Sequence, residues 1–186
     1  MNPLDEVIEW YNFNINQQEF FMEIVKNSHK IDNNIVANAI LKKYKLSSQK
    51  KDDIKIIIDN SKKELDNLTI VSLWAVFEAF LNDNLKKQTD KITLGIVDPI
   101  SNEIINYALK GVDRWLKDEV LELFKIIISN SYIVGNVKDI YKYRNWISHG
   151  KSGEKPPVSN LTPFMAYQRL TVFLTEAKLI EENIDE

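Results

Sequence analysis

The chain has 186 residues, of which 44% are hydrophobic and 27% are charged, with five glycines and five prolines. This is the composition of a globular protein, and we expect one domain over residues 1–186 with a core that needs no disulfide or metal for support. Because the chain has no cysteine, a cysteine nucleophile, an iron–sulfur cluster, a cysteine-rich zinc site and a disulfide-built secreted scaffold are excluded.

The net charge of −3 limits the partners that the chain can take. A protein that coats nucleic acid through its overall field needs a positive charge, so any contact with nucleic acid is expected to be local. No apolar run reaches membrane-spanning length, and the first residues lack the basic and apolar regions of a signal peptide. We therefore expect a soluble, cytoplasmic protein with no membrane contact.

Apolar residues recur at three-and-four spacing along the first half of the chain, which predicts helices. The first helix carries the apolar positions of residues 4–25, and a short helix covers 31–44. A long core helix, or two helices stacked in sequence, covers about 48–87. The stretch 91–100 contains β-branched residues, a glycine and a proline, which indicates a loop or a short extended segment.

Capping residues mark the helices of the second half. Ser101 is expected to cap a helix that Gly111 ends, and Asp113 to cap the next, which runs through Ile128. Gly135-Asn136 is expected to lie between this helix and the next one.

The last two predicted helices are also delimited by their ends. One runs from Val137 to Gly150, where a loop rich in glycine and proline follows, and Thr162 with Pro163 opens the other. The final helix is expected to turn six residues inward: Phe164, Tyr167, Leu170, Phe173, Leu174 and Ile180. The predicted fold is all-α with no substantial sheet.

An arginine and a histidine lie close together in the segment Arg144-Asn145-Trp146-Ile147-Ser148-His149, and the chain has only two histidines. His149 falls in the last helical turn before Gly150, so its imidazole is expected at an open helix end. There the helix macrodipole favours the protonated ring. A histidine that can hold or release a proton near neutral pH is the usual general acid or base.

The neighbours of His149 have different directions on the helix. Asn145 lies four residues earlier, so it shares the face of His149 and its amide can orient the ring. Arg144 is rotated from His149 by about 140°. The two converge only through the reach of arginine, a local distortion or a partner subunit. We assign Ser148, directly before His149, a supporting role.

Glu78 is the only charged residue between Asp66 and Asp83. Its helical face is otherwise apolar and comprises Trp74, Phe77, Leu81 and Leu85. A carboxylate in these surroundings is desolvated and needs a partner, for which Arg144 is the best candidate. Such a pair would hold the guanidinium in a planar geometry and aim its remaining donors at a phosphate.

Phe77-Glu78 in a hydrophobic helix, followed by Arg144-Asn145-x3-His149-Gly150 at the end of a later one, resembles the HEPN superfamily of all-helical ribonucleases. The resemblance covers about two-thirds of the chain, and residues 1–45 add nothing to it. It implies an up-and-down helical bundle with additional helices. It also implies RNA cleavage without metal or other cofactor, with Arg144, Asn145 and His149 as catalytic residues and Glu78 and Ser148 in support.

The resemblance further implies the partners of the chain. In this family two subunits form a homodimer, each gives one arginine and one histidine to a composite site, and the RNA product ends in a 2′,3′-cyclic phosphate. The expected role is a toxin or antiphage-defence effector, with an antitoxin or defence-system protein as a further partner. A toxin subgroup paired with nucleotidyltransferase antitoxins has tyrosine two places after the histidine. Lys151 stands there in this chain, which disfavours that subgroup.

A local basic patch is expected around the motif, where five cations face two carboxylates. They are Lys138, Lys142, Arg144, Lys151 and Lys155 against Asp139 and Glu154. Lys142 and Lys151 are the expected substrate-binding residues. Three aromatic residues nearby, Tyr141, Tyr143 and Trp146, can stack on RNA bases, although aromatic residues at helical spacing more often pack in a core or interface.

Two other functions are compatible with these residues. One is a non-catalytic HEPN-like module that binds RNA, a nucleotide or a protein. The other is a helical scaffold in which His149 caps carbonyl groups and Arg144 forms a structural ion pair. The second histidine, His29, is expected to be a solvated residue between helices.

Overall fold

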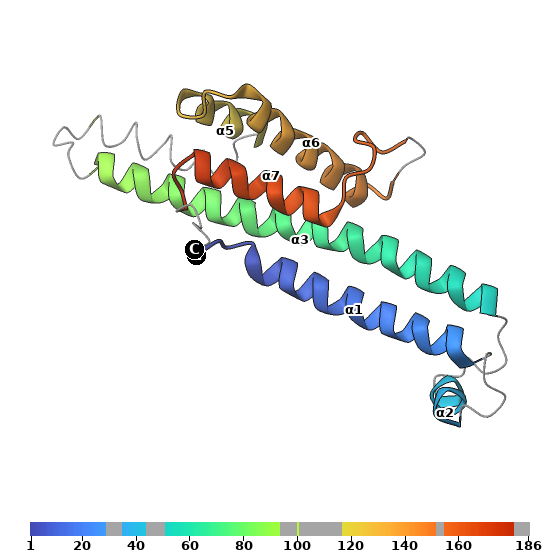
Figure 1. Cartoon of the computed structure of the whole chain (residues 1–186). Coiled ribbons are helices and arrows are strands. Elements are labelled where there is room, and N and C mark those ends of the chain that lie inside the picture. Colours follow the sequence, from blue (N-terminus) through green and yellow to red (C-terminus); the bar gives the residue numbers. More distant parts are fainter. Residues whose placement is uncertain (29–34, 44–50, 94–99, 101–116, 152–154, 181–186) are drawn as a thin grey trace. The chain divides into compact units, whose positions relative to one another are not determined.

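The computed structural model describes residues 1–28, 35–43, 51–93, 100, 117–151 and 155–180 (Figure 1). Within these ranges every regular element is a helix and there is no strand, which confirms the all-α fold. None of the described helices is long and apolar enough to cross a membrane.

The chain forms two compact units. The N-terminal unit comprises residues 6–69, and the motif unit comprises residues 1–5 together with 70–186. Helix α3 (Lys51–Thr93) contributes residues to both. The single domain over residues 1–186 stays a prediction.

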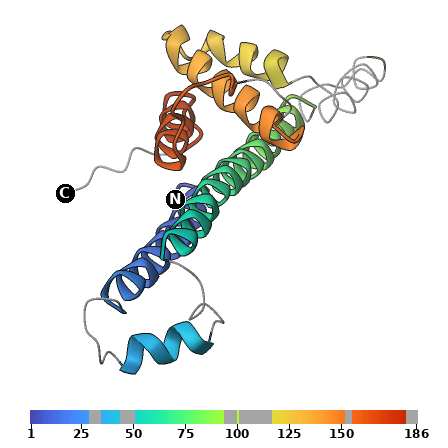
Figure 2. The ribbon, with the colours of Figure 1, turned by 90° about the vertical axis from the view of Figure 1, so that its right-hand side faces the viewer.

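The N-terminal unit is built on helix α1 (Asp5–Ser28) and the first part of α3, which run antiparallel side by side (Figures 1 and 2). Two polar contacts set their register: Tyr11 Oη donates to Asp66 Oδ1 over 2.8 Å, and Lys62 Nζ lies 3.1 Å from Glu19 Oε1. A short helix, α2 (Ile35–Lys43), adds to one end of the pair. The core there consists of Val25, Leu41, Ile54 and Ile58.

Helix α3 is one continuous helix, which decides between the two arrangements that the sequence left open. Neither glycine nor proline occurs along it, and eight buried hydrophobic side chains line it: Ile54, Ile58, Leu65, Ile70, Leu73, Trp74, Phe77 and Leu81. The helix continues to Thr93, so residues 91–93, which we expected in a loop, are helical. Residues 94–99 lie outside the described ranges.

The motif unit packs three further helices with the second part of α3. These are α5 (Lys117–Leu123), which continues into a short 3₁₀ helix, η1 (Phe124–Ile126), then α6 (Ser131–Ser148) and α7 (Pro163–Glu176). Helix α6 contacts both α5 and α7. Phe173 of α7 is central to the core, since its ring centroid lies 5.5 Å from that of Phe77 in an edge-on contact and 5.2 Å from that of Phe124.

The first residues of the chain are bound to α7 by a polar network. The buried side chain of Asn2 donates from Nδ2 to Thr171 Oγ1 over 2.8 Å, and Tyr167 Oη donates to Asp5 Oδ1 over 2.8 Å. Burial, reinforced by the bond to Asp5, raises the pKa of Tyr167. Leu4 is fully buried beside this network. The amino terminus is therefore part of the motif unit.

The predicted start of the motif helix was wrong. Helix α6 begins at Ser131, and Gly135 lies inside it. The reason is the Asn130 cap, whose side chain accepts a hydrogen bond from the Tyr132 N–H over 3.1 Å. Burial of Val134 then stabilises the first turns despite the glycine.

The helix expected to run through Ile128 also ends early. Its described part changes to a 3₁₀ turn at Phe124, where the Ile127 N–H bonds to the Phe124 carbonyl oxygen three residues earlier. The helix between Ser101 and Gly111, and the cap at Asp113, lie outside the described residues.

The predicted start of the last helix is confirmed. Thr162 Oγ1 accepts from the Met165 N–H over 3.2 Å, and Pro163 occupies the first turn. Of the six side chains expected to face inward, Phe164 is 56% exposed. Nine positions at 100° each place it about 180° from the buried Phe173. The helix ends at Glu176, so Ile180 lies beyond it.

The Tyr11–Asp66 contact predicts a loss of stability in alkali. Burial and then the bond to Asp66 raise the pKa of Tyr11, whereas an unfolded tyrosine deprotonates near pH ~10. The stabilisation is therefore complete below that pH and is lost as the pH rises toward the folded pKa. We expect Tyr11→Phe to lower the free energy of unfolding by about 1 kcal/mol at pH 7 and to flatten its decline above pH ~10.

Urea unfolding at a series of pH values measures both effects. The matched control is Tyr132→Phe, because the Tyr132 side chain is 69% exposed. Equal losses of stability in the two variants would contradict the role of the buried hydroxyl.

Candidate functional site

The motif helix ends in a Schellman arrangement that presents His149. His149 is the C-cap residue of α6. The Gly150 N–H bonds to the Ile147 carbonyl and the Lys151 N–H to the Trp146 carbonyl, both over 3.0 Å, which is the pairing of this motif. Gly150 has a φ of +76°, a left-handed conformation that glycine adopts without steric cost. The predicted end of the helix is therefore confirmed.

The His149 side chain is exposed, as is that of Ser148 before it. The backbone N–H of His149 is bound to the Asn145 carbonyl over 2.9 Å, so the cap position is held by the helix itself. The described residues form no hydrogen bond with the imidazole. The ring is consequently accessible to a substrate at the end of α6.

Arg144 lies on the inward face of α6, seven residues after the buried Val137 and four after the buried Ile140. Its guanidinium is held on one side by Asn145, whose Oδ1 accepts from Arg144 Nη1 over 3.0 Å. Arg144 Nε is shielded from solvent, and no described residue accepts a hydrogen bond from it. A buried N–H of a cation without an acceptor is costly. A phosphate oxygen would satisfy it through a charge-assisted bond.

Asn145 contacts both Arg144 and His149, although not through the expected bond from its amide to the His149 ring. Its side-chain oxygen is bound to Arg144, and its backbone carbonyl accepts from the His149 N–H. The structure shows no hydrogen bond from its amide to the His149 ring. Asn145 therefore orients the arginine, and it is linked to the histidine only through the helix backbone.

Glu78 is half-buried in α3 and accepts a hydrogen bond from Trp74 Nε1, one turn earlier, over 2.7 Å. The structure does not show the Glu78–Arg144 pair that we expected. Trp74 is 1% exposed, and its ring centroid lies 5.1 Å from that of Tyr141 on α6. Glu78 is thus connected to the motif helix through Trp74 and Tyr141.

Trp74 was not among the predicted site residues. Its spacing of four from Glu78 was the available signal, since residues four apart face each other on a helix. The contact with Tyr141 joins two helices that are distant in the sequence. No local sequence pattern predicts this contact.

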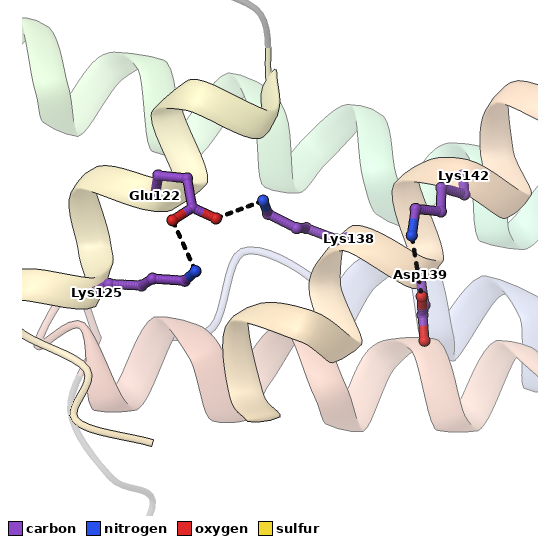
Figure 3. Close-up of polar contacts among 5 residues, drawn as sticks. All are labelled: Glu122, Lys125, Lys138, Asp139 and Lys142. Carbon is purple, nitrogen blue, oxygen red and sulfur yellow. Dashed lines mark hydrogen bonds and ion pairs between the residues drawn. The ribbon is translucent and has the colours of Figure 1, made fainter. Parts of the chain in front are cut away.

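Two lysines of the predicted basic patch form ion pairs. Lys142 Nζ lies 3.8 Å from Asp139 Oδ1 on the same helix, and Lys138 Nζ lies 2.5 Å from Glu122 Oε1 of α5 (Figure 3). Lys125 contacts the other oxygen of Glu122, and hydrogen bonds from Lys125 and Lys138 lower the pKa of that carboxyl group. Glu122 is 16 residues before Lys138 in the sequence, so its contribution could not be foreseen.

The other residues near the motif differ in their exposure. Lys151 is half-buried and has a positive φ of 55°, and Lys155 is exposed. Tyr143 and Trp146 pack together with centroids 5.5 Å apart. Tyr141 packs on Trp74, so this aromatic side chain belongs to the packing between helices.

Across the described ranges, no group of three or more His, Cys, Asp or Glu side chains is placed to hold a metal ion. His29 lies outside those ranges. The arrangement at the end of α6 offers an accessible imidazole, an oriented guanidinium and a buried donor that needs an acceptor. These groups suit proton transfer beside a bound anion.

The chain matches no protein-family model, no curated protein and no solved structure.

Gly135 within α6 and Gly150 in the turn after it predict opposite effects of the same substitution. Gly150→Ala places a side chain at a φ of +76°, which should lower the free energy of unfolding by about 1 kcal/mol and loosen the turn that presents His149. Gly135→Ala is the control, since Gly135 is helical and a Cβ there would meet no atom within 4 Å. It should raise stability by about 0.5–1 kcal/mol.

Denaturant unfolding gives the two signs, and hydrogen exchange at residues 147–151 reports the local effect of Gly150→Ala. Faster exchange confined to that turn is expected. A stabilising effect of Gly150→Ala would refute the requirement for a left-handed residue.

Proposed function

We propose that the chain is a metal-independent endoribonuclease of the HEPN type that acts as a toxin or antiphage-defence effector on cytoplasmic RNA. The observation that carries the proposal is the end of α6. There an exposed His149 follows Arg144, whose guanidinium is held by Asn145 and keeps a buried Nε donor without a described acceptor.

The reaction that suits these groups is an attack of the ribose 2′-hydroxyl on the adjacent phosphorus. A bond forms between the 2′-oxygen and phosphorus, and the bond between phosphorus and the 5′-oxygen breaks. His149 takes the proton from the 2′-hydroxyl or gives one to the 5′-oxygen, and solvent water exchanges the other proton. The products are a 2′,3′-cyclic phosphate and a 5′-hydroxyl.

Arg144 is proposed to stabilise the phosphorane, whose oxygens carry the developing negative charge. Its buried Nε would donate to one of these oxygens. A donor that is already oriented stabilises such charge without a cost of reorganisation. Asn145 supports this role because it holds Nη1 from the other side.

A composite site in a homodimer would bring together residues that one helix separates. Five positions place Arg144 and His149 about 140° apart around α6, and Arg144 lies on the inward face. In the proposed dimer, each subunit gives its Arg144 and its His149 to one composite site, where His149 of one subunit acts with Arg144 of the other at the phosphate. Lys151 and Lys142 would contact the flanking RNA backbone, and an antitoxin or defence-system protein would control the site.

A second candidate function is a non-catalytic HEPN-like module that binds RNA, a nucleotide or a protein. The ion pairs of Lys138 with Glu122 and of Lys142 with Asp139 favour it. They reduce the positive charge available for phosphates along α6.

Cleavage of labelled RNA by the purified chain in EDTA tests the proposal. We expect products that end in a 2′,3′-cyclic phosphate, which mass spectrometry identifies. Removing the acid–base group in His149→Ala should slow cleavage by about 10²–10⁴-fold, and Arg144→Ala should slow it by about 10²–10³-fold. Neither variant should lose its helical circular dichroism.

His29→Ala is the matched control, because His29 is the only other histidine of the chain, and it should cleave as the wild type does. Cleavage by His149→Ala at the wild-type rate would refute the catalytic role. Binding of RNA without any change in it would favour the non-catalytic module.

A further inference from the structure

Helix α1 carries a second apolar face in addition to the one that it packs against α3. Three large aromatic side chains on it are exposed: Trp10 by 48%, Phe13 by 63% and Phe20 by 68%. Phe13 and Phe20 lie about 160° and 180° around the helix from Tyr11, which contacts α3. Large apolar side chains gathered on an exposed face mark an interaction surface.

The spacing of this face is that of a helix-packing seam. Its five positions, Trp10, Phe13, Gln17, Phe20 and Ile24, follow one another at intervals of three, four, three and four residues. This is the heptad pattern by which one helix packs along another. The seam spans about 21 Å, which suits a partner helix of about 15 residues.

A groove opens beside the seam and would take an anchoring side chain. It has a volume of about 740 Å³, and its lining includes Gln17, Phe20, Phe21 and Ile24 of α1, Ile40 and the cation Lys43 of α2, and Ile58 of α3. All of these belong to the N-terminal unit. Gln17, Phe20 and Ile24 belong to both the seam and the groove, so the two features form one surface.

The charge beside the seam indicates the chemistry of the partner. Glu9 and Glu23 are exposed and occupy equivalent flanking positions, each directly before a seam residue. A second copy packed on the same face would bring glutamates against glutamates, which is unfavourable. A partner helix with lysine or arginine on its flank would instead be attracted.

We propose that α1 is a docking surface for a basic amphipathic helix of another protein. The partner helix lays its apolar residues along Trp10, Phe13 and Phe20, inserts one large side chain into the groove, and pairs its cations with Glu9 and Glu23. This is helix-in-groove recognition. It does not depend on the proposed ribonuclease activity, because every residue involved belongs to the N-terminal unit.

The test uses the full chain and two synthetic helices of about 15 residues. Both carry leucine at seam spacing, one flanked by lysine and the other by glutamate, and fluorescence anisotropy measures their binding. We expect the lysine-flanked helix to bind at least about tenfold more tightly than the glutamate-flanked one. The charge-reversed variant Glu9→Lys/Glu23→Lys should invert this preference.

The aromatic seam is tested with Phe13→Ala/Phe20→Ala, which should weaken binding of the lysine-flanked helix by about tenfold or more. Both side chains are exposed, so circular dichroism should stay unchanged. Phe164→Ala is the control, since Phe164 is a similarly exposed phenylalanine on α7, and it should bind as the wild type does.

Four results would overturn the proposal. They are equal binding of both helices, binding of neither below about millimolar concentration, an equal loss of binding in Phe164→Ala, and self-association of the wild type that Phe13→Ala/Phe20→Ala abolishes. The last result, measured by sedimentation, would assign the face to a second copy of this chain.

Discussion

The contact of Trp74 with Tyr141 is the interaction on which the candidate site depends. It joins α3, which carries Glu78, to α6, which carries the motif, and the same indole donates to Glu78. Trp74 also packs on Phe77. The Phe77 ring in turn contacts Phe173 of α7, and the Phe173 ring contacts Phe124. A buried tryptophan combines a large apolar surface with one donor that needs a partner. The packing of the core and the position of the carboxylate are therefore set together.

The packing of α6 and the turn that ends it give Arg144 and His149 different environments. Packing of α6 directs Arg144 inward, where Asn145 holds its guanidinium. The Schellman turn at Gly150 ends the helix at Ser148, with His149 as the C-cap, and leaves the imidazole exposed. The arginine is thus shielded and oriented, and the histidine is accessible. This difference in environment is what an anion-binding cation and a proton-transfer group respectively require.

Local signals in the sequence predicted the helix ends well where one residue type has a distinct physical role. Thr162 with Pro163 and the glycine after His149 are such cases, and the structure confirms them. The start of α6 was misjudged because Gly135 looks like an interruption. The Asn130 cap and the burial of Val134 outweigh its modest cost. Phe164 was misjudged because hydrophobic character alone does not give the direction of a side chain on its helix.

The sequence by itself determined the all-α class and the adjacency of Arg144, Asn145 and His149, because helical periodicity and chain spacing are local properties. Only the tertiary structure decided which groups meet across helices. It paired Glu78 with Trp74, brought Tyr141 onto that indole, and placed Glu122 beside Lys138. These contacts join residues far apart in the chain. Their partners are selected by the packing of whole helices, which no short stretch of sequence encodes.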